Sequence, residues 1–340
     1  MKKAVILFNL GGPDNLDSVE PFLFNLFNDP AIISIPSFIR YPLAKLISKR
    51  RAPIAKNIYR EMGNKSPILQ LTEQQAKSLE KNLLIKGNYK CFVVMRCWHP
   101  RAIDVIKEVK KYKPEEIILL PLYPQFSATT SGSSIDEWNQ VCKKENYKIK
   151  TKIICCYPTE DNFIESHVSL IKKTIEKLKD KNFKLIFSAH GLPESKIRKG
   201  DPYQWQVEET VKKIMSKLSN ENLDYTITYQ SRVGPMKWIG PSTDEEIVKY
   251  SKEKKGLVVV PVAFVSEHSE TLVELDIEYR KLAEKNGCSF YKRVSALGIE
   301  ENFMKALAKL ILKPAEKGSF VSSLTCPNKF TKCPCRDANI

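Results

Sequence analysis

Short apolar segments alternate with longer amphipathic segments along almost the whole chain. The apolar segments lie at residues 3–9, 90–96, 116–122, 151–156, 184–189, 225–230, 256–264 and 289–293. Between them, apolar residues recur at helical spacing near residues 73–86, 101–112, 133–144, 161–179, 204–219, 243–254, 270–285 and 301–312. Nearly continuous apolar strands separated by helices are typical of parallel sheets that are buried on both faces. The pattern therefore predicts an α/β fold.

The predicted strands fall into two series of about four, one in each half of the 340-residue chain. A chain of this length exceeds the needs of one small core. We therefore expect two doubly wound, Rossmann-like α/β lobes, each with a mainly parallel four-stranded sheet flanked by helices. The predicted boundaries are 1–155 and 156–315 for the lobes and 316–340 for a cysteine-rich tail. The last helix, 301–312, is a candidate to pack on the first lobe.

Composition limits the classes of partner. The chain has 55 Lys and Arg against 39 Asp and Glu, a formal net charge of +16. The basic residues are spread along the chain instead of being gathered in one arm, so a solvated basic surface is a better interpretation than a nucleic-acid site. The G-x-G-x-x-G and P-loop patterns are absent, which disfavours nucleotide binding. We expect no nucleic-acid partner.

The sequence contains no signal of membrane insertion or secretion. No run of about eighteen uncharged apolar residues occurs, so no transmembrane helix is predicted. The apolar run that begins at Ala4 stops at Gly11-Gly12-Pro13 without a cleavage site, which disfavours a signal peptide. Nine cysteines in such a chain do not indicate a disulfide scaffold. A cytoplasmic protein is expected.

One segment, residues 32–53, combines apolar residues with five basic residues and has no acidic residue. Such a segment could rest against anionic lipid headgroups or cover a pocket for an acidic ligand. An amphipathic helix packed on the core is the alternative. The sequence does not decide between these two interpretations.

Two of the four histidines follow predicted strands of the second half. His190 follows strand 184–189, and His268 follows strand 256–264 and leads into an acidic helix. Polar, Gly and Pro residues gather at the carboxyl ends of the other strands as well, where doubly wound folds bind their ligands. We therefore expect both histidines to lie at a ligand site.

The acidic helix carries Glu270, Glu274 and Glu278 at intervals of four residues, which predicts one stripe along the helix. A solvated acidic face is the common explanation of such a stripe. Carboxylates beside a neutral imidazole can instead shuttle protons or hold a divalent cation. The residues alone leave both explanations open.

Seven segments, in order and spanning about residues 3–312, are similar to those of ferrochelatases: NLGGP at 9–13, KRRAP at 49–53, SPI at 66–68, YPQFSATTSGSS at 123–134, SAHGLP at 188–193, QSRVGPMKWIGP at 230–241 and EHSETLVELDIEY at 267–279. The chain thus resembles a bacterial ferrochelatase with a cysteine-containing C-terminal extension. The resemblance implies a chelatase-like fold. It also implies a lyase that inserts Fe²⁺ into protoporphyrin IX, releases two protons and completes haem synthesis.

The resemblance also implies roles for the acidic helix and its histidines. His190 corresponds to the histidine that faces the macrocycle, and Glu270 to the glutamate opposite it, so these two residues are expected to handle the pyrrole protons and the substrate iron. His268 is expected to support Glu270 by hydrogen bonding. Glu274 and Glu278 are expected to continue a path for protons or iron. A π-type widening of this helix is implied as well.

The porphyrin pocket implied by the resemblance has an apolar wall and polar ends. Leu10, Trp238 and Phe264 match positions that line the ring. Guanidinium and hydroxyl groups suit the propionates, which makes candidates of Arg50, Arg51, Tyr59, Ser66 and Ser133. The lip over the pocket, about residues 32–67, resembles a family element that can touch membrane. Peripheral contact with the inner face of the cytoplasmic membrane is therefore expected.

The tail contains Cys326, Cys333 and Cys335 within ten residues. Some ferrochelatases hold a [2Fe–2S] cluster with such a tail and one internal cysteine, so these three are candidate ligands, although the chemistry itself requires no cofactor. The internal position aligns with Ser166, and Cys142, Cys155 or Cys156 would have to supply the fourth ligand. A zinc site or an unliganded tail are the alternatives.

Two other functions fit the same fold. A related chelatase would insert iron into coproporphyrin or cobalt into a corrin precursor. A non-catalytic porphyrin- or haem-binding protein would retain haem without inserting metal. The expected partners are protoporphyrin IX, ferrous iron and membrane lipid, and the protein is expected to be a monomer or a homodimer.

Overall fold

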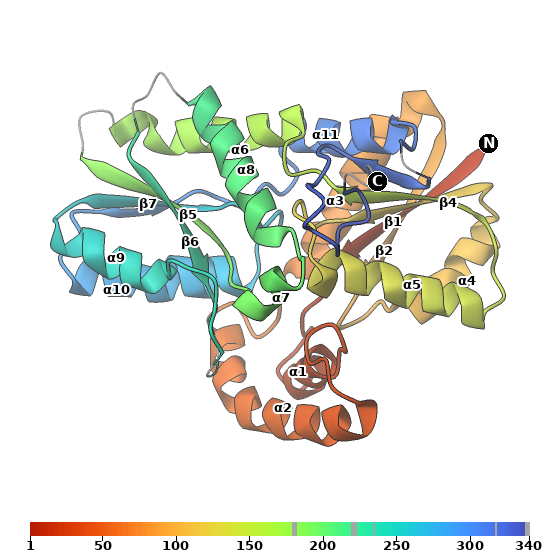
Figure 1. Cartoon of the computed structure of the whole chain (residues 1–340), viewed down its shortest axis with the longest axis horizontal. Helices are drawn as coiled ribbons and strands as arrows, with labels where there is room; N and C mark the ends of the chain where they lie inside the picture. The colour runs from red at the N-terminus through yellow and green to blue at the C-terminus, as the bar shows by residue number, and fades with distance from the viewer. Residues whose placement is uncertain (179–181, 219–222, 233, 235, 317, 337–340) are drawn as a thin grey trace. The chain divides into compact units, whose positions relative to one another are not determined.

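The computed structural model describes residues 1–178, 182–218, 223–232, 234, 236–316 and 318–336 (Figure 1). The chain forms two compact units. The first consists of Met1–Tyr123, Ser127–Cys155 and Leu307–Ser322, and the second of Pro124–Phe126, Cys156–Ala306 and Ser323–Ile340. Both units are α/β structures with parallel sheets, as the alternation of apolar and amphipathic segments predicts.

The first unit is built on a sheet with the strand order β2-β1-β3-β4-β9. Its strands are β1 (Lys2–Asn9), β2 (Asn88–Met95), β3 (Glu116–Pro121), β4 (Lys150–Cys156) and β9 (Phe320–Ser322). The first four match the predicted strands and pair in parallel. The prediction of four strands in this sheet is wrong, because β9 adds a fifth. With only three residues, β9 is too short to leave a periodic pattern in the sequence.

Helices cover both faces of the first sheet. On one face, α4 (Ala102–Tyr112) and α5 (Ser133–Lys144) bury apolar side chains against β1 and β2, where Phe8 meets Trp138 edge to face. On the other face lies α3 (Ile68–Leu83), which is followed by the short η1 (Leu84–Lys86) (Figure 1). Because both faces are covered, β1 and β3 are buried almost throughout and read as continuous apolar runs.

The second unit contains a parallel sheet of four described strands, as predicted, and their order is β6-β5-β7-β8. They are β5 (Phe183–His190), β6 (Tyr225–Gln230), β7 (Gly256–Pro261) and β8 (Tyr291–Arg293). One face is covered by α6 (Asp161–Ile175) and α8 (Tyr203–Lys217), and the other by α9 (Thr243–Lys252) and α10 (Tyr279–Lys285) (Figure 1). Besides the acidic helix, the second unit contains η3 (Glu176–Leu178), α7 (Glu194–Arg198) and the first part of α11 (Glu301–Leu312), whose residues from Leu307 onward belong to the first unit.

The acidic helix is not a uniform α-helix. Residues Glu270–Glu278 form a π-helix, η5, and α10 continues from Tyr279. A second π-helical turn, η2 (Ala128–Gly132), leads into α5. The widening implied for the acidic helix is thus present. π-Helical turns are rare and often occur at functional sites, because they alter the spacing of side chains along one face.

Two helices of the first unit, α1 (Val19–Phe27) and α2 (Ser37–Arg60), lie outside the segments with helical periodicity, although a helix was one interpretation of residues 32–53. The buried face of α2 carries Ala44, Ser48, Ala52 and Tyr59. Six of its large apolar side chains are instead exposed, namely Phe38, Ile39, Tyr41, Leu43, Leu46 and Ile54. An amphipathic helix that packs its large apolar face on the core therefore does not describe this segment. No helix in the described part of the chain is long and apolar enough to span a bilayer.

Candidate active site

The site is built where two neighbouring strands of the second sheet end. β5 and β6 pair in parallel, and their register sets His190 beside Gln230. Parallel strands end at the same edge of a sheet, so the residues that follow them lie close together. This edge brings His190 and the turn after Gln230 against the start of η5.

His190 contacts Glu270 directly. Its Nδ1 lies 2.8 Å from Oε2 of Glu270, and the two side chains are 41% and 21% exposed. Burial lowers the pKa of His190, but the charge of Glu270, its hydrogen bond and the charge of Glu274 outweigh burial and raise it. Burial in turn raises the pKa of Glu270, but the charge and hydrogen bond of His190, together with His268 and Ser231, outweigh burial and lower it. The pair therefore favours an imidazolium beside a carboxylate.

Glu274 is held by four hydrogen bonds. Gln230 Nε2 donates to Oε2 at 2.9 Å and the Ser231 backbone N–H to Oε1 at 2.9 Å, while Ser231 Oγ donates to Oε2 at 2.5 Å. Tyr279 Oη donates to Oε1 at 3.0 Å. Burial and the neighbouring charge of Glu270 nevertheless raise the pKa of Glu274, so the second carboxylate takes up a proton more readily than a free glutamate does.

Ser231 joins the two carboxylates, and the sequence analysis gave it no role. Its hydroxyl lies 2.5 Å from Glu274 Oε2 and 3.3 Å from Glu270 Oε2. Its backbone is left-handed, with φ of 60°, which turns the chain sharply after β6. Gln230 is fixed in turn by a hydrogen bond from Ser188 Oγ at 2.7 Å. The position of Gln230-Ser231 at a strand end was the available signal for both residues.

His268 lies near Glu270 but does not form the expected hydrogen bond. Its Nε2 is 3.9 Å from Glu270 Oε1, which is beyond hydrogen-bonding distance. Its Nδ1 lies 3.0 Å from the Ser266 carbonyl, which holds the ring in place. The Phe264 ring packs against it, with centroids 4.9 Å apart. His268 thus acts on Glu270 through space, as one of the causes that lower its pKa.

The predicted stripe of three glutamates divides into two parts. Glu270 and Glu274 converge on Ser231, whereas Glu278 is exposed at the end of η5. The solvated-face explanation therefore holds for Glu278 alone. The chemistry available at the other two positions is that of a half-buried carboxylate pair next to an imidazole, which can accept protons and attract a divalent cation.

Trp238 packs beside the histidine strand. It forms an isolated antiparallel bridge with Pro193, and a Cβ added to Gly191 would lie 3.3 Å from its ring. Its indole Nε1 is buried and has no hydrogen-bond partner among the described residues. Gly191 is required here because the indole ring and the Gln230 carbonyl, 2.8 Å from that Cβ position, leave no room for a side chain.

The candidate porphyrin residues of the first unit have varied surroundings. Arg50 is exposed and Arg51 half-buried on α2, while Tyr59 is buried among α1 side chains near half-buried Leu10. Ser66 packs against Gly12, where a Cβ would lie 2.5 Å from the Ser66 side chain. Close approach of these two segments therefore depends on glycine at position 12.

Ser133 is buried and its hydroxyl is already engaged. Its Oγ donates to Asp29 Oδ2 at 2.6 Å and accepts from Arg96 Nε at 2.7 Å. Arg96 also pairs with Asp29 at 2.8 Å. Any interaction of Ser133 with a propionate would have to replace part of this network, which the sequence analysis did not foresee.

The tail cysteines lie in the second unit, and all three are buried. Gln206 Nε2 donates to Cys326 Sγ at 3.1 Å and to Cys156 Sγ at 3.4 Å. The Cys333 side chain hydrogen-bonds to Cys326 and, with burial, raises the pKa of the Cys326 thiol. Four thiols match the donor set of a [2Fe–2S] cluster in kind and number. Among the described residues, however, no three His, Cys, Asp or Glu side chains are already arranged to hold a metal ion.

Comparison with known proteins identifies the family. The ferrochelatase family model matches residues 2–315. The chain is 64% identical to the ferrochelatase of Pelagibacter ubique over 98% of its own length and 99% of the relative's. It is 51% identical to the ferrochelatase of Rickettsia felis over the full length of both chains.

Solved structures agree in fold. The sirohydrochlorin chelatase SirB of Bacillus subtilis subspecies spizizenii, in complex with cobalt, matches with a TM-score of 0.50 and 11% identity over 91% of this chain and 93% of that one. DR2241 of Deinococcus radiodurans, described as similar to chelatases, matches with a TM-score of 0.52 and 9% identity over 93% of this chain and 56% of its own. Because the family model matches most of the chain and the relatives are 51–64% identical over nearly their full length, the chain belongs to the ferrochelatase family.

Proposed function

We propose that this protein is a lyase that inserts Fe²⁺ into protoporphyrin IX, forms protohaem and releases two protons as the last step of haem synthesis. The observation that carries the proposal is the His190–Glu270 contact beside Glu274, in a chain of the ferrochelatase family. A flat porphyrin directs two pyrrolic protons inward, so a metal ion can enter only after a base removes them. Binding a distorted ring would expose the nitrogen lone pairs to the metal.

His190 is the proposed base. The Glu270 carboxylate, 2.8 Å away, stabilises the imidazolium that forms when His190 accepts a proton. The same carboxylate raises the pKa of His190 and so reduces the fraction of free base. A divalent substrate ion at Glu270 would offset the carboxylate charge and lower the pKa of His190. Arrival of iron would thus make the base available.

The three glutamates of η5, Glu270, Glu274 and Glu278, form the proposed path for protons or iron. Glu270 and Glu274 share the Ser231 hydroxyl, and Glu278 is exposed to solvent. The raised pKa of Glu274 suits a group that takes up and releases protons near Glu270. Loose binding is required, since a set of strong fixed ligands would retain the metal ion.

The proposed porphyrin contacts are apolar side chains for the ring and polar side chains for the propionates. Trp238 and Phe264 of the second unit and Leu10 of the first are the proposed apolar contacts of the ring. Arg50, Arg51, Tyr59, Ser66 and Ser133 of the first unit are the proposed propionate partners. A guanidinium fork suits a carboxylate, and Arg50 is exposed on α2.

Helix α2 is the proposed membrane contact. It exposes Phe38 by 76%, Leu46 by 53% and Ile54 by 65%, next to Lys45, Lys49 and Arg50. Apolar side chains among cations suit a surface of anionic lipid. We accordingly propose a cytoplasmic protein that rests on the inner face of the membrane, where a hydrophobic porphyrin would partition.

The substrate assignment is tested by anaerobic assays of the purified protein with Fe²⁺ and either protoporphyrin IX or coproporphyrin III. Faster formation of protohaem supports the proposal. Faster turnover of coproporphyrin III would show that coproporphyrin III, and not protoporphyrin IX, is the substrate. Tight retention of added haem without any metal insertion would instead identify a binding protein.

We also propose that the tail holds a [2Fe–2S] cluster with Cys156, Cys326, Cys333 and Cys335 as ligands. Gln206 lies within hydrogen-bonding distance of both Cys156 and Cys326, which favours Cys156 over Cys142 and Cys155 as the fourth ligand. A bound cluster would supply a one-electron centre and cross-link the tail to the second unit. The proposed insertion chemistry does not pass through it.

Absorption spectra and iron and sulfide analysis of freshly purified protein test the cluster. Visible bands with about two iron and two sulfide per chain support it. Their absence, or stoichiometric zinc, would contradict it. Cys156→Ser should abolish the bands. Cys155→Ser is the matched control, because consecutive residues of β4 point to opposite faces of the sheet, so this buried thiol points away from Cys156 and its loss should leave the bands unchanged.

A further inference from the structure

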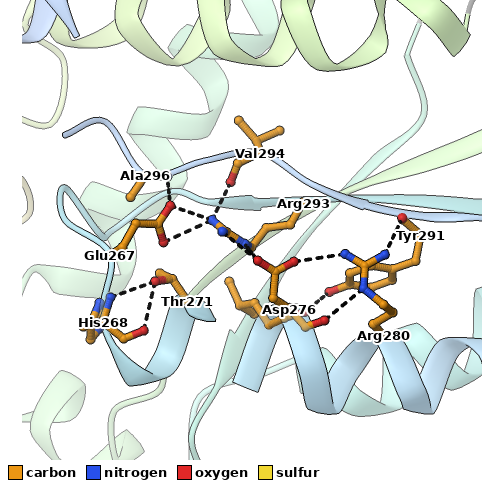
Figure 2. Close-up of polar contacts among 10 residues, drawn as sticks. Glu267, His268, Thr271, Asp276, Arg280, Tyr291, Arg293, Val294 and Ala296 are labelled. Atoms are coloured by element: carbon orange, nitrogen blue, oxygen red, sulfur yellow. Dashed lines mark hydrogen bonds and ion pairs between the residues drawn. The ribbon is translucent and has the colours of Figure 1, made fainter. Parts of the chain in front are cut away.

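Arg293 joins the two ends of the segment that carries the acidic residues. It is the last residue of β8, and its side chain is only 10% exposed. Figure 2 shows its guanidinium between Glu267, which precedes η5, and Asp276, which lies within η5. Neither carboxylate takes part in the contacts of His190 or Glu274 described above, so this cluster is separate from the proposed chemistry.

The geometry uses both sides of the guanidinium. Arg293 Nη1 lies 2.9 and 3.2 Å from the two carboxylate oxygens of Glu267. Arg293 Nε and Nη2 lie 2.8 and 2.7 Å from Asp276 Oδ2. A planar fork can serve two carboxylates at once, whereas a lysine ammonium is a single point of charge. The position therefore calls for arginine specifically.

Other contacts fix the same two ends. The Ala296 backbone N–H donates to Glu267 Oε1 at 2.9 Å, and Tyr291 Oη donates to the Leu275 carbonyl at 2.5 Å. Tyr291 and Arg293 alternate with exposed Lys292, so both point from β8 toward η5. The strand thus fastens η5 by side chains along one face (Figure 2).

His268, Glu270 and Glu274 all lie between the two fastened ends. η5 is π-helical, a geometry that occurs rarely and needs support from its surroundings. We propose that Arg293 is a positioning residue that clamps Glu267 to Asp276 and thereby holds Glu270 against His190 and Glu274 against Ser231. This inference rests on the proposed function, since it assigns to Arg293 the alignment of those groups.

The test compares three variants with a matched control. Arg293→Gln removes the clamp, Arg293→Lys keeps the charge without the fork, and Glu267→Gln weakens one end only. The control is Arg280→Gln, because Arg280 also binds Asp276, at 3.0 Å, but within the described part of the chain it does not bind Glu267, and it is 38% exposed. Each is assayed for kcat and for KM of Fe²⁺ and of porphyrin. Hydrogen exchange of residues 268–278 and the unfolding temperature are measured alongside.

Both Arg293 variants should lose about 10- to 100-fold in kcat/KM for iron, because misplacing reacting groups by about 1 Å costs that much. In both variants the KM for porphyrin should change little, and backbone hydrogen exchange of residues 268–278 should become faster. Glu267→Gln should show smaller changes of the same kind. This variant tests the inference even if Arg293→Gln fails to fold. Arg280→Gln should stay within about twofold of wild type.

Wild-type turnover in Arg293→Lys, or equal losses in Arg280→Gln, would overturn the inference. So would a loss that merely follows the folded fraction, with unchanged exchange in 268–278. Failure of the wild-type protein itself to insert iron would refute the proposed function instead. In that case the exchange contrast between Arg293→Gln and Arg280→Gln still decides whether the clamp orders the segment.

Discussion

The Glu270 carboxylate and the His190 imidazole alter each other's proton affinity because they are in contact. Burial alone would lower the pKa of His190, and the carboxylate reverses that effect. The sequence interpretation set the two groups on opposite sides of a porphyrin, whereas in the structure they form one hydrogen-bonded pair. Proton transfer and cation binding at this site are therefore coupled.

Replacing Glu270 by Gln should lower the pKa of His190. The wild-type imidazole should titrate above its ordinary value of about 6.5, and the variant below its wild-type value, since burial remains while the opposing charge is lost. An NMR titration of the His190 ring measures both. Glu278→Gln is the control, because this exposed glutamate is not among the causes that shift His190. An unchanged or higher pKa in Glu270→Gln would contradict the pairing.

Ser231 offers a test of the turn after β6. Ser231→Ala and Ser231→Gly both remove the hydroxyl that joins the two glutamates, so both should lower turnover. Alanine keeps the strain of a left-handed backbone at φ of 60°, whereas glycine relieves it. Ser231→Gly should therefore be more stable than Ser231→Ala by about 1 kcal/mol. Thermal unfolding measures the difference, and an alanine variant as stable as the glycine variant would argue against a strained turn.

At the scale of elements, apolar runs predicted the strands well. All eight predicted strands are present, because parallel strands covered on both faces must be apolar throughout. For α2 a helix was only one of two interpretations, because most of its buried residues are small and six of its large apolar residues are exposed. The glutamate stripe assumed α-helical spacing. The π-helix instead brings only Glu270 and Glu274 to Ser231, a register that depends on contacts with β6 and β8.

The exposed apolar residues of α2 predict binding to lipid. Replacing Phe38 and Leu46 together by Glu should lower the affinity for anionic vesicles by more than tenfold, since burying one such side chain contributes about 2 kcal/mol. Co-sedimentation of the protein with the vesicles measures this affinity. Ile85→Glu is the control, because Ile85 is 87% exposed but lies in η1, away from α2. Equal binding by the α2 variant and the control would show that α2 is not the contact.

At the scale of the molecule, the sequence predicted where the site lies better than it predicted which side chains contact one another there. Strand ends pointed to His190 and to Gln230-Ser231, because parallel strands deliver their carboxyl ends to one edge. The Ser231–Glu274 contact and the Arg293 clamp could not be foreseen, since both join residues that are about 17 to 43 positions apart through tertiary packing. Substrate and reaction came from the ordered resemblance of seven segments, which the family comparison bears out.

The central claim is that the His190–Glu270 pair performs the insertion. Its most direct test is the anaerobic turnover of Fe²⁺ with protoporphyrin IX by His190→Ala and Glu270→Gln, with porphyrin binding measured separately by fluorescence. The exposed Glu284→Gln on α10 serves as control. Both site variants should bind porphyrin yet lose at least about 100-fold in kcat, while the control matches wild type. Wild-type turnover in either site variant would contradict the account.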